Sequence, residues 1–289
     1  MNLATIRAVT ELQTGCATAT LRVVSVGPLG LHYLEWGVAD RPPLLFLHGG
    51  SAHAHWFDGV APAFADRYHV VSLDQRGHGE SEWARPATYA TEDFARDLLG
   101  VLDALGWRQA IVVGHSMGGH NAMAFAAWHP ERVRALVVVD SRPSIPEERL
   151  KQMHKRGYRA LRLHPTREEA VAAFRLLPRE TMADPRLLAH LATMGVVERA
   201  GGWVYRFDPE ANRSRQPTDT GRLLDRISAP ALIVRGELSP ILTREMAAHV
   251  VATIPGARLV EIPGTYHHLV LDAPGAFVRA LADFLSTLD

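Results

Sequence analysis

The sequence predicts an α/β fold in which a mainly parallel sheet is covered by helices on both faces. From residue 44 onward, short apolar runs alternate with longer segments whose apolar residues recur at helical spacing. Most of the short runs show no polar alternation, which is typical of strands buried on both sides. Strands and helices that alternate in this way build parallel sheets, with a helix in each crossover.

The mainly apolar runs are the expected strands of the parallel sheet. They are Leu44–Leu47, Val70–Leu73, Ile111–Val113, Leu136–Val139, Ala231–Val234 and Arg258–Ile262. Two earlier runs, Leu21–Val26 and Leu31–Trp36, flank Gly27-Pro28 and predict an opening hairpin. The segments with helical spacing are Thr91–Leu105, Asn121–His129, Arg244–Ile254 and Pro274–Leu285.

Residues 141–226, called the insertion below, interrupt this alternation. Helix starts are expected near Pro146, Thr166 and Pro185, and Thr166 with Glu169 has the pattern of a capping box. A strand-like piece at 203–207 lies among these helices.

The place of the insertion between two sheet strands predicts a cap. Such a segment must lie at one end of the sheet, and active sites of open α/β sheets lie at the carboxyl ends of the strands. We therefore expect a helical cap at 141–226 on an α/β core made of residues 21–140 and 227–289. Residues 1–20 are then an N-terminal extension.

The insertion has an excess of basic residues. It holds 17 Lys and Arg against 11 Asp and Glu, a net charge of +6, whereas the whole chain has a net charge of zero. Charge runs usually face water, so a solvated arginine-rich surface is one interpretation. Attraction of an anionic substrate is the other.

The bulk composition favours a soluble globular protein. A net charge of zero gives no overall attraction to nucleic acid or acidic membranes. No apolar run approaches the ~18 residues that a membrane span needs. Arg7 and Glu11 interrupt the N-terminal segment, which lacks the apolar core of a signal peptide. With Cys16 as the single cysteine, we expect a cytoplasmic protein. The oligomeric state is left open.

Fifteen histidines raise the question of a metal site. The nearest candidates are His53 and His55, close to His48. No further His, Asp or Glu follows them at the spacing of a dinuclear site, and no cysteine is near. We therefore expect no metal and no cofactor.

The strongest local motif is Gly114-His115-Ser116-Met117-Gly118, which lies between a predicted strand and a helix. This is the G-x-S-x-G pattern in the strand–turn–helix context that it requires. The turn is so tight that Ser116 needs small neighbours, and the serine hydroxyl is exposed for attack. The pattern predicts that Ser116 is a nucleophile.

A second motif, His48-Gly49-Gly50, follows the strand at 44–47. Acyl transfer places negative charge on a carbonyl oxygen, which preorganised backbone N–H groups stabilise. The expected donors of this oxyanion hole are the N–H of Met117, directly after the nucleophile, and the N–H of Gly50. A third motif, Pro263 to His268, follows the last strand and offers a histidine base.

Together these motifs resemble the α/β-hydrolase superfamily, over nearly the whole chain. The turn at Asp74–Ser81 also matches a turn common in that superfamily. The segments DQRGHG, VGHSMGGHN, VVVDSRP and VRGELS look most like the branch that contains the (acetamidomethylene)succinate hydrolases. The resemblance implies an eight-stranded sheet, a helical cap, no cofactor, and cleavage of an ester, amide, lactone or carbon–carbon bond. It also implies that His267, rather than His268, is the base.

One residue departs from the superfamily pattern. The common acid is the fourth residue of G-x-x-D, and here that motif reads Gly236-Glu237-Leu238-Ser239. Serine cannot carry the charge that stabilises a protonated His267. An acid after the sixth strand occurs in the branch that the chain resembles, and Asp140 is expected to fill that role. Glu237 is the alternative acid.

These residues predict a serine hydrolase that acts on a small carbonyl substrate through an acyl-enzyme on Ser116. A cofactor-free dioxygenase of the same fold and a ligand receptor with slow turnover are the alternatives. No motif identifies the substrate. The residues expected to line its pocket are His53, His55, Trp56, Arg142 and Trp203.

Overall fold

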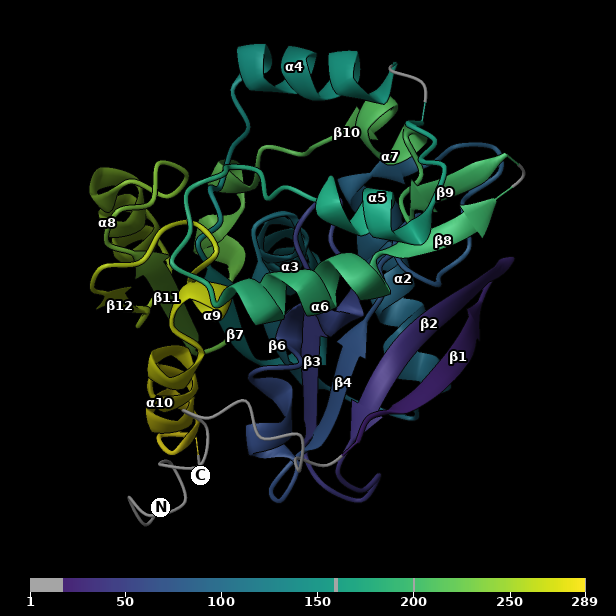
Figure 1. The fold of residues 1–289 in the computed structure, drawn as a ribbon. Coiled ribbons are helices and arrows are strands. Elements are labelled where there is room, and N and C mark those ends of the chain that lie inside the picture. Colours follow the sequence, from purple (N-terminus) through teal and green to yellow (C-terminus); the bar gives the residue numbers. More distant parts are fainter. Residues whose placement is uncertain (1–17, 159–160, 200, 289) are drawn as a thin grey trace.

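An eight-stranded, mostly parallel sheet runs through the centre of the protein, in the order β1-β2-β4-β3-β6-β7-β11-β12 (Figure 1). The computed structural model describes residues 18–158, 161–199 and 201–288. Cys16 and most of the predicted N-terminal extension lie outside these residues. The strands are β1 (Thr20–Val26), β2 (Leu29–Trp36), β3 (Pro43–Leu47), β4 (His69–Leu73), β6 (Ala110–His115), β7 (Val133–Val139), β11 (Ala231–Gly236) and β12 (Arg258–Ile262).

Strand pairing follows the prediction from the sequence. β1 pairs with β2 and β2 with β4 in antiparallel fashion, and the other neighbours in the sheet are parallel. The predicted α/β fold with an eight-stranded, mainly parallel sheet is confirmed.

Helices cover both faces of the sheet because the strands are apolar on both sides. Leu44 and Phe46 of β3 pack into one apolar layer, and the alternate residues Leu45 and Leu47 pack into the other. The first layer contains η2 (Ala54–Phe57), η3 (Ala61–Phe64) and α10 (Pro274–Leu285). The second contains α2 (Thr91–Ala104), α3 (Met117–Trp128) and α8 (Arg244–Thr253).

The insertion lies at one end of the sheet strands, above the core in Figure 1. Its larger elements are α4 (Glu147–Gly157), α5 (Arg167–Ala172), α6 (Pro185–Met194), the hairpin β8 (Val196–Arg199) and β9 (Gly202–Tyr205), and α7 (Glu210–Arg213). Its short strand β10 (Arg215–Gln216) pairs with β5 (Tyr89–Ala90) of the core. Short 3-10 turns, η5 (Thr220–Arg222) and η6 (Leu224–Arg226), lead back to β11.

The helix starts predicted for the insertion correspond to observed helices. Thr166 is the N-cap of α5, and its hydroxyl oxygen accepts the N–H of Glu169 at 3.2 Å. Pro185 is the first residue of α6. The strand-like piece predicted at 203–207 is β9, and its partner β8 was not expected. In the part of the chain that the structure describes, no helix is long and apolar enough to cross a membrane.

Candidate active site

Ser116 lies in the turn between β6 and α3, at the end of the sheet that faces the insertion. Its φ is +53°, a conformation that a residue with a side chain rarely adopts. A side chain at Gly114 would collide with the backbone of Gly118, and one at Gly118 would collide with the backbone of Leu47. This tight packing fixes the turn and leaves the Ser116 side chain half-exposed. Helix α3 begins at Met117, four residues earlier than predicted, because the glycines of this turn weaken the helical pattern.

Ser116, His267 and Asp140 form one hydrogen-bonded chain. Ser116 Oγ lies 3.0 Å from His267 Nε2, and His267 Nδ1 lies 2.8 Å from Asp140 Oδ2. His267 comes from the loop after β12, and Asp140 directly follows β7. The carboxyl ends of these parallel strands therefore bring together residues that are 127 to 151 positions apart in the sequence.

Ser239, at the common position of the acid, contacts the same carboxylate. Its hydroxyl group donates a hydrogen bond of 2.5 Å to Asp140 Oδ2, and its oxygen accepts the N–H of Ile241 at 3.1 Å. The alternative acid, Glu237, is exposed and accepts the N–H of Gly264 at 2.8 Å. The described contacts of His267 include Asp140 and not Glu237.

Burial dominates the electrostatics of Asp140. It raises the pKa of this carboxyl group to about 8, while the hydrogen bond from Ser239 and the charge of Arg235 lower the pKa. Because Asp140 and His267 share a hydrogen bond in a buried site, their protons are coupled and titrate as a pair.

Burial also lowers the pKa of His267 well below its ordinary value, and repulsion by His268, Arg149 and Arg142 acts in the same direction. A neutral imidazole is the form that can accept a proton from a serine hydroxyl group. The surroundings of His267 therefore favour a base over an acid in the resting protein.

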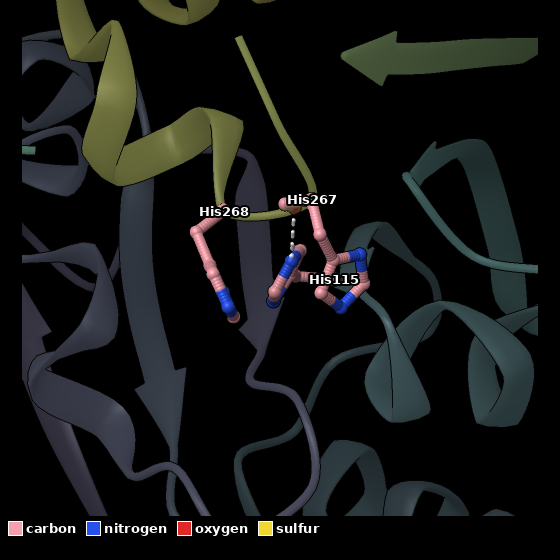
Figure 2. A group of neighbouring side chains, drawn as sticks. All are labelled: His115, His267 and His268. Atoms are coloured by element: carbon pink, nitrogen blue, oxygen red, sulfur yellow. Dashed lines mark hydrogen bonds between the residues drawn. The ribbon is translucent and has the colours of Figure 1, made fainter. Parts of the chain in front are cut away.

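Two further histidines, His115 and His268, lie beside His267 (Figure 2). The Nε2–H of His115 donates to the carbonyl oxygen of His267 at 3.0 Å, and the ring of His268 lies 4.9 Å from that of His267. The ring of Trp56 stacks on the ring of His115, with 6.1 Å between the ring centroids. The first contact fixes the backbone of His267, and the ring of His268 lies against its side chain.

The predicted oxyanion donors lie beside Ser116. Gly50 and Met117 both line the cavity that Ser116 and His267 face. Met117 is the first residue of α3, so its N–H has no carbonyl within the helix to bind. The positive end of the α3 dipole points toward the same place.

Core and insertion together line this cavity, and its charged residues are all basic. Trp56 and Arg142, two of the predicted pocket residues, are among its walls. Among the described lining residues there is no Asp or Glu. The lining arginines are Arg142, Arg149, Arg156, Arg175 and Arg215.

Arg215 is the most deeply placed of these arginines, being only 1% exposed. It donates to the carbonyl oxygen of Tyr89 at 3.0 Å and to Asn121 Oδ1 at 2.9 Å, and its guanidinium lies 4.8 Å from the centre of the Phe94 ring. Burial lowers its pKa to about 10, which leaves the side chain charged at neutral pH. Of these arginines, only Arg142 was expected in the pocket from the sequence, where the charge excess of the insertion is the only relevant signal.

The other three predicted pocket residues lie elsewhere, which corrects the prediction for them. His53 is buried and binds the carbonyl of Leu191 through Nε2 at 3.1 Å. His55 binds Asp58. Trp203 lies in β9, with Arg167 5.8 Å from its ring centre. None of these three side chains is among the residues that line the cavity.

Comparison with known proteins identifies the family. Residues 42–274 match the family described as alpha/beta hydrolase fold. The chain belongs to the α/β-hydrolase family. It is 30% identical over 272 residues to a 2-(acetamidomethylene)succinate hydrolase of Mesorhizobium japonicum, covering 91% of this chain and 94% of that protein. It is 32% identical over 267 residues to an esterase of Mycobacterium tuberculosis, covering 88% of this chain and 86% of that protein.

Solved structures agree with this assignment. The crystal structure of E-2-(acetamidomethylene)succinate hydrolase matches with a TM-score of 0.83 and 27% identity, over 93% of this chain and 99% of that chain. The predicted resemblance to this branch of the α/β-hydrolases is confirmed. The family and the names of these relatives make the protein a hydrolase.

Proposed function

We propose that the protein is a serine hydrolase that cleaves a small, carboxylate-bearing carbonyl compound through an acyl-enzyme. The observation that carries the mechanism is the chain of hydrogen bonds from Ser116 Oγ through His267 to Asp140, at 3.0 and 2.8 Å. A serine hydroxyl group becomes a nucleophile when a base is held within this reach and a third group orients the base.

The reaction has two halves. His267 Nε2 takes the proton of Ser116 as Oγ attacks the substrate carbonyl carbon, and Asp140 stabilises the imidazolium that forms. His267 then gives the proton to the leaving oxygen or nitrogen, and the alcohol or amine departs. In the second half, His267 takes a proton from water, the resulting hydroxide attacks the acyl carbon, and the proton returns to Ser116 as the carboxylic acid leaves.

The N–H groups of Gly50 and Met117 are the proposed oxyanion donors. They line the same cavity as Ser116, and backbone donors of this kind need no rearrangement when charge develops on the carbonyl oxygen. Loss of one such donor typically costs ~10²–10³ in kcat.

The cavity wall supports a preference for anions. Five arginines and no described Asp or Glu line it. Arg142 is half-buried, and its Nε is buried with no hydrogen-bond partner among the described residues. A guanidinium with an unused donor beside a catalytic serine is well suited to bind a carboxylate. The relative whose name includes succinate supports the same substrate class.

Two measurements test the proposal. A serine-directed phosphonate should label the protein once, at Ser116, and peptide mapping would locate the label. Mono-p-nitrophenyl adipate should then be hydrolysed with a higher kcat/KM than p-nitrophenyl hexanoate, which has the same acyl length without the carboxylate. Labelling at another serine contradicts the mechanism, and a preference for the neutral ester contradicts the substrate class. Oxygen consumption without ester hydrolysis would favour the dioxygenase alternative.

A further inference from the structure

A second cluster of histidine and carboxylate side chains joins the insertion to the core, outside the catalytic cavity. His55 Nδ1 lies 2.8 Å from Asp58 Oδ2, and His190 Nε2 lies 2.8 Å from the same oxygen. One ligand atom from each residue lies within 4.8 Å of the other two. His55 belongs to η2, Asp58 caps that turn, and His190 comes from α6 of the insertion.

These three donors are a suitable set for a divalent transition metal. Two imidazole nitrogens and one carboxylate oxygen are common zinc ligands, and a site with three protein ligands keeps a fourth position for water. Zinc binds such atoms at about 2.0–2.2 Å, so tetrahedral ligands stand roughly 3.3–3.6 Å apart. The distances of 2.8 Å from Asp58 Oδ2 to His55 Nδ1 and to His190 Nε2 would have to widen by less than about 1 Å.

The exposure of the cluster gives an ion access to it. The exposed fractions of the side chains are 43% for His190, 24% for Asp58 and 16% for His55. Asp58 Oδ1 is buried and has no hydrogen-bond partner in the part of the chain that the structure describes. This carboxylate is therefore only half satisfied, although burial is costly for an unpaired oxygen.

Protons compete with a metal ion for these ligand atoms. Burial raises the pKa of Asp58, but hydrogen bonds from His190 and His55 outweigh it, and the net direction is downward. The hydrogen bond to Asp58 raises the pKa of His190. A metal must displace protons from such ligands, so its binding should weaken in acid.

We propose that His55, Asp58 and His190 bind a divalent transition-metal ion, with Zn²⁺ as the best match, and that the ion fastens α6 of the insertion to the core. The apolar contacts next to the cluster show how a bound ion would stabilise the packing of the insertion on the core. Leu187 and Leu191 of α6 share an apolar cluster with Trp56 and Phe57 of η2. An ion bound to both elements would therefore hold together two surfaces that already pack against each other.

Titration of the chelator-treated protein with Zn²⁺ at pH 7.5 tests this proposal. Calorimetry should show one site in the wild type, and affinity should fall at least ~10-fold in His190→Gln and in His55→Gln, since each loses a ligand. Zn²⁺ should raise the Tm of the wild type and not that of His190→Gln. His249→Gln is the matched control, because His249 is an exposed histidine of α8 outside the cluster.

Cobalt gives a second measurement that does not depend on stability. Co²⁺ in a four-coordinate site should give intense visible absorption in the wild type and in His249→Gln, and not in His190→Gln. His115, His267 and His268 of the candidate active site form another group that could hold an ion (Figure 2). Equal binding by His190→Gln and the wild type would place the ion at another site and overturn the proposal, as would no binding by the wild type.

Discussion

The hydroxyl group of Ser239 donates a hydrogen bond of 2.5 Å to Asp140 Oδ2. Ser239 occupies the position after β11 where the α/β-hydrolase pattern usually has its acid, and Asp140 directly follows the neighbouring strand β7. The same carboxylate oxygen accepts the Nδ1–H of His267 at 2.8 Å. The usual acid position is therefore still connected to the proposed base, His267, through a hydroxyl group that donates to a carboxylate at the end of the next strand.

Replacing Ser239 with Ala should shift the pH dependence of turnover to higher pH. The hydrogen bond from Ser239 lowers the pKa of Asp140, which burial raises to about 8, so its loss raises that pKa further. When Asp140 and His267 together hold one more proton, His267 cannot accept the proton of Ser116. The value of kcat/KM at neutral pH should therefore fall. Activity should recover at alkaline pH. Profiles of kcat/KM from about pH 5 to 10 would measure the shift. Their midpoint reports the titration of Asp140 and His267 as a pair.

Ser286→Ala is a suitable control for this comparison, because Ser286 is exposed and its hydroxyl group binds the carbonyl of Asp283 near the C-terminus. Its profile should match that of the wild type. A Ser239→Ala profile with an unchanged midpoint and a uniform loss of rate would show that Ser239 acts only on the position of Asp140.

Ser116→Ala should abolish turnover and leave the fold intact. The Ser116 hydroxyl group contacts His267 at the edge of a cavity, so its loss removes a nucleophile and opens no void in the core. Loss of a catalytic serine in a comparable triad costs ~10⁶-fold in kcat. Steady-state kinetics and a thermal melt would measure both effects. Retention of a tenth of the wild-type activity would refute the proposed nucleophile.

The layout of the fold was predictable because its signals are local. Most strands of the parallel sheet are short apolar runs, and the observed bounds differ from the predicted ones by three residues or fewer, as for β7, which begins at Val133 rather than Leu136. The start of α3 was misplaced because Gly118 and Gly119 weaken a helix, yet the catalytic turn needs them. Local propensity and function conflict at this point.

The candidate site was predictable where a motif spans a few residues and not where contacts are distant. The turn at Ser116 and the loop at His267 follow strands and are visible in the sequence. The five cavity arginines are scattered from position 142 to position 215, and no spacing connects them. Trp203 was expected in the pocket, but it lies in β9, which pairs with β8, and it is not among the residues that line the cavity.

The same limit applies to the metal-binding cluster that we propose. In the sequence, His53 and His55 have no further ligands at the spacing of a dinuclear metal site. His190 lies 132 positions after Asp58, on a helix that only the folded insertion brings to η2. Such a cluster cannot be recognised from sequence spacing alone.

Arg142→Gln should reduce the selectivity for anionic substrates. Hydrogen bonds to charged groups contribute about 1.5–3 kcal/mol, so kcat/KM for mono-p-nitrophenyl adipate should fall roughly 10–100-fold. The value for p-nitrophenyl hexanoate should change little. For the wild type, kcat/KM with the anionic ester should also fall as salt is added, since ions screen exposed charges over ~8–10 Å.

Arg222→Gln provides the control for charge alone, because its side chain is 86% exposed and does not line the cavity. It should leave the ratio between the two esters unchanged. An equal loss for both esters in Arg142→Gln, together with a flat salt profile, would leave the basic insertion as a solvated surface.

Asp140→Asn should lower kcat by orders of magnitude. An amide can neither hold His267 in the tautomer that accepts a proton at Nε2 nor stabilise the imidazolium, and the comparable change in a serine protease costs ~10⁴-fold. Glu237→Gln is the matched control, since Glu237 is exposed and binds the N–H of Gly264. It should change stability by no more than about 0.5 kcal/mol and leave kcat near the wild-type value.

The double variant Asp140→Asn with Ser239→Asp tests whether the acid can move between strands. The Ser239 hydroxyl group already lies 2.5 Å from Asp140 Oδ2, so a carboxylate at position 239 has only a short distance to bridge to His267. We expect the double variant to regain at least ~10-fold in kcat over Asp140→Asn, because an anionic partner again stabilises the imidazolium. In the wild-type background, Ser239→Asp should instead reduce activity at neutral pH, since two adjacent carboxylates hold a proton between them. If Glu237→Gln loses most of its kcat while Asp140→Asn stays near the wild-type value, Glu237 is the acid. The double variant should then show no gain in kcat.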